Sequence, residues 1–293
     1  MNQKASSVGE LAARLLLSNK PGKVSRVFQR SAYVRSGEDF ILLLWGDLRS
    51  PMTINVVGSV SASKIRAEEK CTMSEDGVML DSVKIEVEGA QTYRTALLDR
   101  WEVILPERQA LRKGVGLIKS LFDASSSGPT LNKDIALRGF VRSTLLPLSK
   151  GTHAPLFSPK NYLPLVGRGG GFTPAGDDFL GGLLATYNFV ARCRKSRQIV
   201  VPRALLRGRT VPESANVLFH SSKGYVDEAM ERLVLKSLMG STGFSDELME
   251  LASRGHTSGM DMSLGVLLCE AAISDADGEG RALHECLDVL WRP

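Results

Sequence analysis

The stretch "GRGGGFTPAGDDFLGGLLATYNFVARCRK", residues 167–195, decides how the second half of this chain is interpreted. Its first residues form a glycine-rich loop that contains Gly167, Gly169, Gly170 and Gly171. Thr173 and Pro174 follow, with Thr173 expected as the N-cap and Pro174 as the first helical residue. Apolar residues at helical spacing then predict a helix over Asp177–Lys195. A loop with accessible N–H groups before a helix N-terminus is suited to binding an anion.

A second stretch of the sequence is similar to the first one. Gly171–Ala185 aligns without a gap with Gly255–Cys269, and seven positions are identical. The identical pairs are Gly171/Gly255, Thr173/Thr257, Asp177/Asp261, Leu180/Leu264, Gly181/Gly265, Leu183/Leu267 and Leu184/Leu268. A glycine inside a helix costs roughly 1 kcal/mol relative to alanine, so Gly181, Gly182 and Gly265 suggest closely packed backbones. We therefore expect the two helices to pair along these glycines, which brings both loops into one site.

The first third of the chain predicts short strands separated by turn signals. The expected strand segments cover residues 23–35, 39–47, 52–63, 77–89 and 90–99. Their close spacing favours an antiparallel sheet or a small barrel. Residues 1–20 contain the apolar stretch Leu11–Leu17, interrupted by Arg14, and predict an amphipathic helix instead of a secretory signal.

After residue 105 the periodicity becomes helical. A helix is expected over 106–124, a loop over 125–130, and a long proline- and glycine-rich connection over 151–173. Further helices are expected over 133–146, 177–195, 213–221, 226–238, 245–254, 260–273 and 281–290. The fold class is therefore α+β, with a β-rich domain at 1–105 and a mainly helical domain at 106–293 that carries the two pseudo-repeated loop–helix modules.

The composition is that of a cytoplasmic globular protein. The chain has 293 residues, of which 43% are hydrophobic and 24% charged, and it has a net charge of +5. No apolar run approaches the ~20 residues that span a bilayer, so no membrane association is expected. Its four scattered cysteines suggest reduced thiols. One basic run lacks acidic residues: Arg192, Arg194, Lys195, Arg197, Arg203, Arg207 and Arg209. It could meet nucleic acid or lie in solvent, and the absence of interleaved aromatic residues disfavours nucleic acid.

Asp177 and Asp178 conflict with a simple anion site, because they would repel an anion in the adjacent loop. Three arrangements resolve the conflict and remain open. A divalent cation such as Mg²⁺ could bridge the aspartates and the ligand. The aspartates could accept hydrogen bonds from an amide or amine of the ligand, or they could only cap backbone N–H groups. His256 is a candidate general acid or base, or a donor to an oxyanion.

Several standard signatures are absent. The glycines do not form the dinucleotide-binding fingerprint, and the chain has no Walker lysine, no zinc-type His/Cys clustering and no GxSxG elbow. These absences argue against a nicotinamide enzyme, a P-loop nucleotidase, a zinc hydrolase and a serine esterase.

Two motifs carry a family resemblance. Phe172–Asp178 reads Phe-Thr-Pro-Ala-Gly-Asp-Asp, and Gly255–Asp261 reads Gly-His-Thr-Ser-Gly-Met-Asp. In this order and separation they resemble the motifs of the AllH-like family, and the segment between them is similar in outline. The chain departs from the family pattern at Ala175, where serine is expected, and at Gly170, where proline is usual. The lost hydroxyl puts an identical substrate specificity in doubt.

The resemblance implies a subunit of an oxamate carbamoyltransferase that acts with partner subunits in allantoin and purine catabolism. A carbamoyl group then passes between carbamoyl phosphate and the amide nitrogen of oxamate. The alternative is a non-catalytic subunit that binds an anionic metabolite or serves as a scaffold, and family members have also been labelled as carboxylases. The expected partners are a small anionic metabolite and other protein subunits.

Residues of the two motifs are compatible with such a transfer. The expected catalytic residues are His256, Asp177 and Asp261, with His256 polarising the carbonyl and an aspartate orienting the amide. The expected substrate- or phosphate-binding residues are Gly169, Gly170, Gly171, Thr173, Gly176, Asp178, Thr257, Ser258 and Gly259. No cofactor is certain; Mg²⁺ is the one the residues suggest, at Asp177 and Asp178.

Overall fold

The computed structural model describes residues 2–58, 62–99, 131, 134–238, 244–255, 257–278 and 280–291. The chain divides into a β-rich unit, Met1–Thr95 with Val226–Glu228, and a helical unit, Ala96–Tyr225 with Ala229–Pro293. The predicted helix over 106–124, the loop over 125–130 and the predicted boundary after residue 105 lie outside the described residues.

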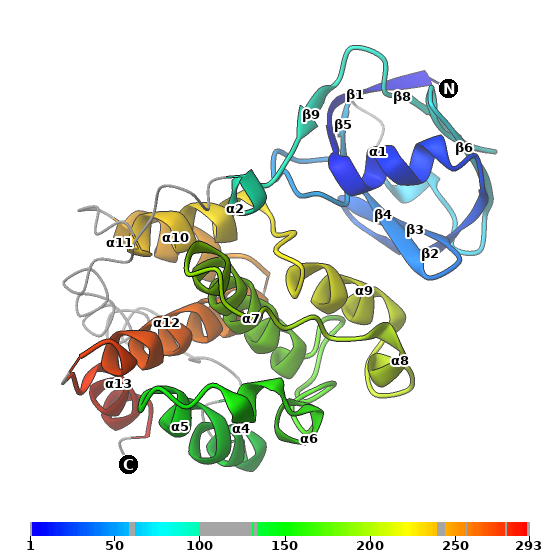
Figure 1. Ribbon diagram of the computed structural model, residues 1–293. Helices are drawn as coiled ribbons and strands as arrows, with labels where there is room; N and C mark the ends of the chain where they lie inside the picture. Colours follow the sequence, from blue (N-terminus) through cyan, green and yellow to red (C-terminus); the bar gives the residue numbers. More distant parts are fainter. Residues whose placement is uncertain are drawn as a thin grey trace. The chain divides into compact units, whose positions relative to one another are not determined.

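The β-rich unit is a closed sheet (Figure 1). Its strands are β1 (Asn2–Gly9), β2 (Pro21–Phe28), β3 (Ser31–Ser36), β4 (Asp39–Leu44), β5 (Thr53–Val57), β6 (Lys70–Ser74), β7 (Gly77–Leu80), β8 (Lys84–Glu86) and β9 (Gln91–Tyr93). They follow the order β5-β4-β3-β2-β6-β7-β8-β1-β9, and the additional pairing of β5 with β1 closes a barrel. Of the two forms that the sequence left open, the barrel is therefore the one observed.

The pairing in this barrel is mixed and not purely antiparallel. Strands β2 to β4 and β6 to β8 form antiparallel hairpins. In contrast, β4 runs parallel to β5, and β1 runs parallel to both β8 and β9. Strand β1, the first strand of the chain, lies between β5 on one side and β8 and then β9 on the other.

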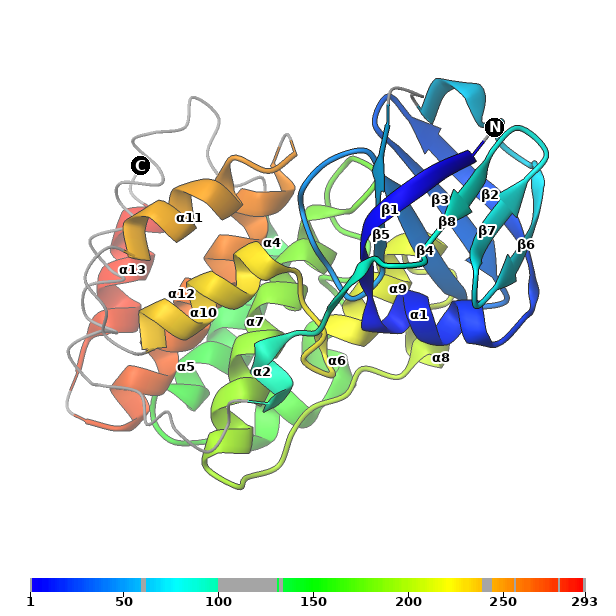
Figure 2. The same cartoon turned by 90° about the horizontal axis from the view of Figure 1, so that it is seen from above.

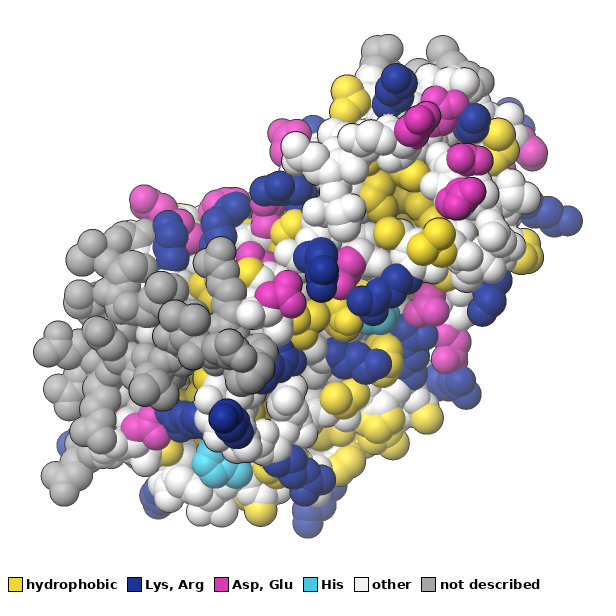
Figure 3. Space-filling view, turned by 45° about the horizontal axis from the view of Figure 1, so that its top comes forward, with side chains coloured by type: hydrophobic (Ala, Val, Ile, Leu, Met, Phe, Trp, Pro, Cys, Tyr) yellow, Lys and Arg dark blue, Asp and Glu magenta, His cyan; other side chains and the backbone are white. Residues whose placement is uncertain are grey.

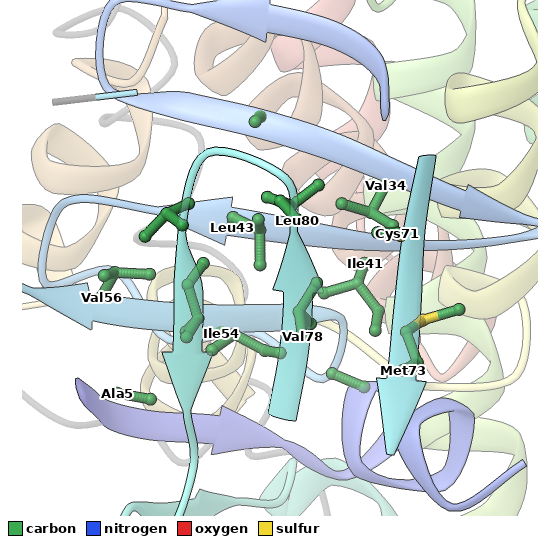
Figure 4. Close-up of a cluster of buried hydrophobic side chains, with 14 of the residues drawn as sticks. Ala5, Val34, Ile41, Leu43, Ile54, Val56, Cys71, Met73, Val78 and Leu80 are labelled. Carbon is green, nitrogen blue, oxygen red and sulfur yellow. The ribbon is translucent and has the colours of Figure 1, made fainter. Parts of the chain in front are cut away.

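Apolar side chains fill the barrel. Ala32 and Val34 of β3, Ile41 and Leu43 of β4, and Ile54 of β5 are fully buried, as alternation along half-buried strands predicts. Figure 4 shows side chains from several strands directed toward one another in this core. Helix α1 (Glu10–Leu17) packs its buried residues against the strands. The predicted β-rich first part is thus confirmed.

Two predictions for this unit fail. Asn2–Gly9 is a strand and not the start of a helix, and β6 was not predicted. Two polar residues of β1, Gln3 and Ser7, are buried, and each has a partner that the sequence does not reveal. Ser7 Oγ donates to Asn55 Oδ1 at 2.8 Å, and Gln3 Oε1 accepts from Trp45 Nε1 at 3.1 Å.

The helical unit contains the helices that the sequence predicted within the described residues. It also contains short helices that were not predicted, at Ala96–Asp99, Pro159–Tyr162 and Arg203–Leu206, and the first of these lies in a segment predicted as strand. The helices are α2 (Ala96–Asp99), α4 (Ile135–Phe140), α5 (Leu146–Leu148), α6 (Pro159–Tyr162), α7 (Ala175–Cys193), α8 (Arg203–Leu206), α9 (Pro212–Ser221), α10 (Glu228–Leu238), α11 (Phe244–Ala252), α12 (Ser258–Ala276) and α13 (Ala282–Leu290). The predicted helix over 133–146 is interrupted by a π-helical turn at Val141–Leu145. Short helices, α6 among them, divide the predicted connection over 151–173.

Helices α7 and α12 form the centre of the helical unit. Both are buried along almost their whole length, and they lie alongside each other in both ribbon views (Figures 1 and 2). Helices α9, α11 and α13 pack against this pair. Among the described residues, no helix has the length and apolar character needed to cross a membrane.

Candidate functional site

The close packing of α7 and α12 depends on glycine. A Cβ atom at Gly182 would lie 2.2 Å from the Met262 carbonyl oxygen, and one at Gly265 would lie 2.1 Å from the Phe179 carbonyl oxygen. No side chain fits at either position. Gly181 instead faces Ser221 of α9 with ordinary contact distances. The predicted pairing of the two helices along glycines is confirmed, with Gly182 in contact in place of Gly181.

These contacts also correct the register of the internal repeat. The contacts are reciprocal when residue 182 corresponds to 265 and residue 179 corresponds to 262, an offset of 83 instead of the aligned 84. The bounds of α7 and α12 differ by the same offset. Asp261 is therefore the counterpart of Asp178 and not of Asp177. The alignment missed this register because it counted identities and could not show which glycines touch a backbone.

The two loops meet where the helices begin. Thr173 Oγ1 and Ser258 Oγ lie 2.8 Å apart and share a hydrogen bond. Helix α7 begins at Ala175, so Pro174 is its N-cap and no side chain caps it. The prediction that Thr173 caps α7 is therefore wrong, because its hydroxyl bonds to the second module. This contact joins two motifs that are separated by more than eighty residues.

The glycine loop presents N–H groups to solvent. Gly167, Gly169 and Gly171 have φ angles of 75°, 91° and 99°, whereas the residues between them do not have positive φ. Such alternation turns successive N–H groups toward one side and forms an anion-binding concavity. Gly169, Gly170 and Gly171 are exposed. Among the described residues, their N–H groups have no hydrogen-bond partner.

Asp177 is occupied by internal hydrogen bonds. Its Oδ1 accepts from the Gly167 N–H at 2.9 Å, and its Oδ2 accepts from Ser214 Oγ at 2.6 Å and from Thr210 Oγ1. The carboxylate thus ties the glycine loop to the start of α9. Of the three arrangements left open, Asp177 adopts the one in which the carboxylate serves the protein's own donors.

Asp178 has a different environment. It is buried, and the hydroxyls of Ser258 and Thr173 lie near enough to lower the pKa of its carboxyl, while its Oδ2 has no hydrogen-bond partner among the described residues. The pKa of Asp178 is raised to about 8, mainly by burial; the hydroxyls of Ser258 and Thr173 lower it, and the nearby Asp261 and Asp177 carboxyls raise it. Asp261 is completely buried. Two carboxyls, one from each module, thus lie close together behind two half-buried hydroxyls.

Gly176 and Gly259 occupy equivalent positions in the two modules. A Cβ atom would lie 1.9 Å from the Leu165 carbonyl oxygen at Gly176 and 1.8 Å from the Leu251 carbonyl oxygen at Gly259. Each glycine also donates its N–H to a loop carbonyl, that of Arg168 at 2.9 Å or Arg254 at 3.1 Å. Their N–H groups are therefore used within the protein, and both glycines fold the loops against the helices.

The remaining predicted site residues are Thr257 and His256. Thr257 is half-buried at the N-cap of α12, beside Ser258. His256 lies outside the described residues. Within the described part of the chain, no group of three or more His, Cys, Asp or Glu side chains could hold a metal ion. Any metal at Asp178 would therefore need hydroxyl, water or ligand oxygens as well.

Sequence reasoning missed Thr210 and Ser214. They fix Asp177, but they lie 33 and 37 residues after it, and a threonine and a serine at such distances carry no recognisable spacing. Gly167 was recognised only as one glycine of a loop. A Cβ atom there would lie 1.9 Å from the Arg209 carbonyl oxygen, which places the loop directly against the end of the basic run.

The basic run is largely used inside the helical unit. Arg192 donates to the Leu97 carbonyl at 2.9 Å, Arg194 pairs with Asp277, Arg197 lies over the Phe157 ring at 4.4 Å, and Arg203 donates to Asn216 at 2.9 Å. Figure 3 shows dark-blue Lys and Arg side chains interspersed with other types on the visible face. Much of this run therefore anchors helices and loops.

Comparison with known proteins agrees with the motifs. The family model described as "Oxamate carbamoyltransferase subunit AllH" matches residues 165–270. No curated protein and no solved structure matches the chain significantly. The matched residues contain both loops, Asp177, Asp178, Asp261 and all of α9. The resemblance found in the two motifs is thereby confirmed: the part of the chain that builds this site matches the AllH family.

Proposed function

We propose that this chain is a subunit of an oxamate carbamoyltransferase-like enzyme and that it binds carbamoyl phosphate where the two loops meet. The observation that carries the proposal is the Thr173–Ser258 hydrogen bond. It brings both motifs of the matched family together next to a loop with exposed N–H groups. The family description supplies the reaction class, and the geometry supports an anion site.

The glycine loop suits the phosphate end of the substrate. Gly169, Gly170 and Gly171 are exposed, and their N–H groups have no hydrogen-bond partner among the described residues. Backbone N–H donors bind phosphate oxygens and also stabilise the charge that develops on a leaving phosphate. Asp177 acts as a positioning residue, because it holds the Gly167 end of this loop.

The reaction is an acyl transfer. The amide nitrogen of oxamate attacks the carbamoyl carbon, the bond from that carbon to the phosphate oxygen breaks, and the amide proton leaves with the phosphate. The half-buried hydroxyls of Thr173 and Ser258 are placed to bond the carbamoyl group. His256 remains the proposed group that polarises the carbonyl.

Two neighbouring glycines test the anion site. Alanine at Gly169 conflicts with a φ of 91° and places its Cβ 2.9 Å from the Ala175 Cβ, whereas alanine at Gly170 enters open space. We expect Gly169→Ala to weaken binding of carbamoyl phosphate at least about tenfold, which corresponds to about 1.4 kcal/mol. Gly170→Ala is the matched control and should bind like the wild type. Calorimetric titration measures both.

The reaction itself needs the partner subunits. We expect the reconstituted complex to form a carbamoylated product from oxamate and carbamoyl phosphate, and Gly169→Ala to lower this rate. Binding without product in the complete complex would contradict the transferase and support the alternative, a non-catalytic subunit that binds an anionic metabolite. Equal binding by both glycine variants and the wild type would place the anion elsewhere.

A further inference from the structure

The corrected register makes Asp178 and Asp261 a related pair. Each is the fourth residue of its helix, counted from Ala175 in α7 and from Ser258 in α12. The reciprocal contacts of Gly182 and Gly265 hold the two helices in one register, and the Asp261 carboxyl lies near enough to raise the pKa of Asp178. Asp177, the neighbouring carboxylate, points to other donors and takes no part in this pair.

The cost of burying two carboxyls is the problem that this pair poses. Both side chains are buried, with exposed fractions of 3% for Asp178 and 0% for Asp261. Buried carboxylates are costly unless something positive or a hydrogen-bond donor compensates them. The hydroxyls of Thr173 and Ser258 bond to each other beside Asp178 and lower its pKa, yet Asp178 Oδ2 has no hydrogen-bond partner among the described residues.

The surrounding donor set is made of oxygen. Two carboxylates and two hydroxyls that lie 2.8 Å apart come from the starts of the two helices. Mg²⁺ prefers such ligands, and it usually binds through one or two carboxylates together with phosphate oxygens of a substrate. The exposed N–H groups of the glycine loop lie in the same module as Thr173 and Asp178, where a phosphate would bind.

We propose that Asp178, Asp261, Thr173 and Ser258 form a Mg²⁺ site, whose cation neutralises the carboxyl pair and contacts the phosphate of the bound substrate. This site deepens the proposed function, on which it rests for the identity of that phosphate. The cation also resolves the conflict between an anionic ligand and nearby aspartates. Asp177, which the sequence suggested as a ligand, is excluded from the site because its own hydrogen bonds occupy it.

The test uses the purified full chain and the metal alone. Because a cation that binds only the native state stabilises it, Mg²⁺ should raise the melting temperature of the wild type. Mn²⁺, followed by electron paramagnetic resonance, should bind at one site per chain. Asp178→Asn should weaken Mn²⁺ binding at least about tenfold, and Thr173→Val should weaken it less.

The direction of the change in melting temperature distinguishes loss of the metal site in Asp178→Asn from misfolding of this variant. Asp178→Asn keeps the shape of the side chain and removes a carboxyl that is costly to bury, so without metal its melting temperature should equal or exceed that of the wild type. Added Mg²⁺ should then have no effect on it. Asp277→Asn, which alters an aspartate paired with Arg194 at the other end of α12, is the matched control and should respond to Mg²⁺ like the wild type.

The outcomes are distinguishable from those of the proposed function. Equal Mn²⁺ binding by the wild type and Asp178→Asn, or no binding at millimolar metal, would overturn the cation site. Carbamoyl phosphate binding that is independent of Mg²⁺ would overturn it as well, while the anion site of the glycine loop would stand. Metal binding without transfer in the complete complex would leave the site in place and contradict the transferase.

Discussion

Asp177 and Asp178 are neighbours in the chain, yet they have opposite environments. Asp177 accepts three hydrogen bonds from the protein, whereas one oxygen of Asp178 is buried without a hydrogen-bond partner among the described residues. Adjacent residues at a helix start point in directions about 100° apart, since a helix has about 3.6 residues per turn. One therefore faces the glycine loop and α9, and the other faces the second module. Because of this rotation, Asp177 positions the glycine loop, whereas Asp178 is a candidate metal ligand.

Glu270 is a second buried acid, remote in sequence from either loop. It is 2% exposed in the middle of α12, and Ser237 Oγ donates to its Oε1 at 2.5 Å. Burial raises the pKa of Glu270 to about 8 against the lowering effect of Ser237. The native state therefore keeps its proton at pH values at which the unfolded chain has lost it.

The sign of the resulting pH dependence follows from linkage. Stability falls as pH rises above the usual pKa of about 4.5 and levels off above about 8. At pH 7 the loss attributable to Glu270 is roughly 3 kcal/mol. Glu270→Gln should flatten this part of the profile, as measured by urea unfolding at several pH values. The exposed Glu250, changed to glutamine, is the control, and an unchanged slope in Glu270→Gln would contradict the assignment.

At the scale of elements, the contact between α7 and α12 is the most demanding packing of the helical unit. Gly182→Ala would place a methyl group 2.2 Å from the Met262 carbonyl oxygen, and backbone cannot move aside easily. We expect a loss of roughly 1–3 kcal/mol in unfolding free energy, or more, as for other overpacked cores.

Gly181→Ala is its control within the same helix. The added Cβ would lie 3.8 Å from Ser221 Oγ, which is ordinary contact, and alanine gains up to about 1 kcal/mol in helix propensity. This variant should therefore be as stable as the wild type or more stable. Denaturant unfolding of the two variants compares them directly, and equal destabilisation would show that the helices do not pack in this register.

Local patterns account for what could be predicted from the sequence. The longer helices in the described parts of the second half were predicted because apolar periodicity is a local signal, whereas α6 and α8 have only four residues each and were not predicted. The glycines of α7 and α12 correctly indicated a close approach of helices. The register was wrong by one residue, because identities between Gly181 and Gly265 carry no information about which glycine touches a carbonyl. Thr210 and Ser214 could not be found, because their partner is distant in the chain. For the same reason the buried polar residues of β1 looked like part of a helix.

For the molecule as a whole, the β-rich unit is discontinuous in sequence. Val226–Glu228 belongs to it, since the Val226 carbonyl accepts from Tyr93 Oη at 3.3 Å and Glu228 accepts from the Arg49 N–H and Nε at 3.0 Å. Three residues are too few to show any periodic pattern, so no analysis of composition or spacing could assign them. The predicted domain boundary after residue 105 remains a prediction.

The reactivity of the cysteine thiols tests how tightly both units are packed. Cys71, Cys269 and Cys286 are buried, and burial raises the pKa of each thiol, to about 11 for Cys71 and about 12 for Cys286. Cys193 is half-buried, and burial raises its pKa less. Because the thiolate is the reactive form, iodoacetamide should modify Cys193 first in the native protein, as followed by mass spectrometry. Cys193→Ser should remove this fast phase. Modification of Cys269 at the same rate would show that the core of the helical unit opens readily.

The pairing of α7 with α12 has a consequence for how such a site can change during evolution. In a homodimer, a substitution in a site on the two-fold axis appears twice, so both halves must tolerate it. Here both halves are covalently joined in one chain, and each substitution appears once. One half carries Thr173 and Ala175 where the other carries His256 and Ser258. A single chain can thus keep Asp178 and Asp261 in matching places while the residues around them specialise for the two unlike ends of one small molecule.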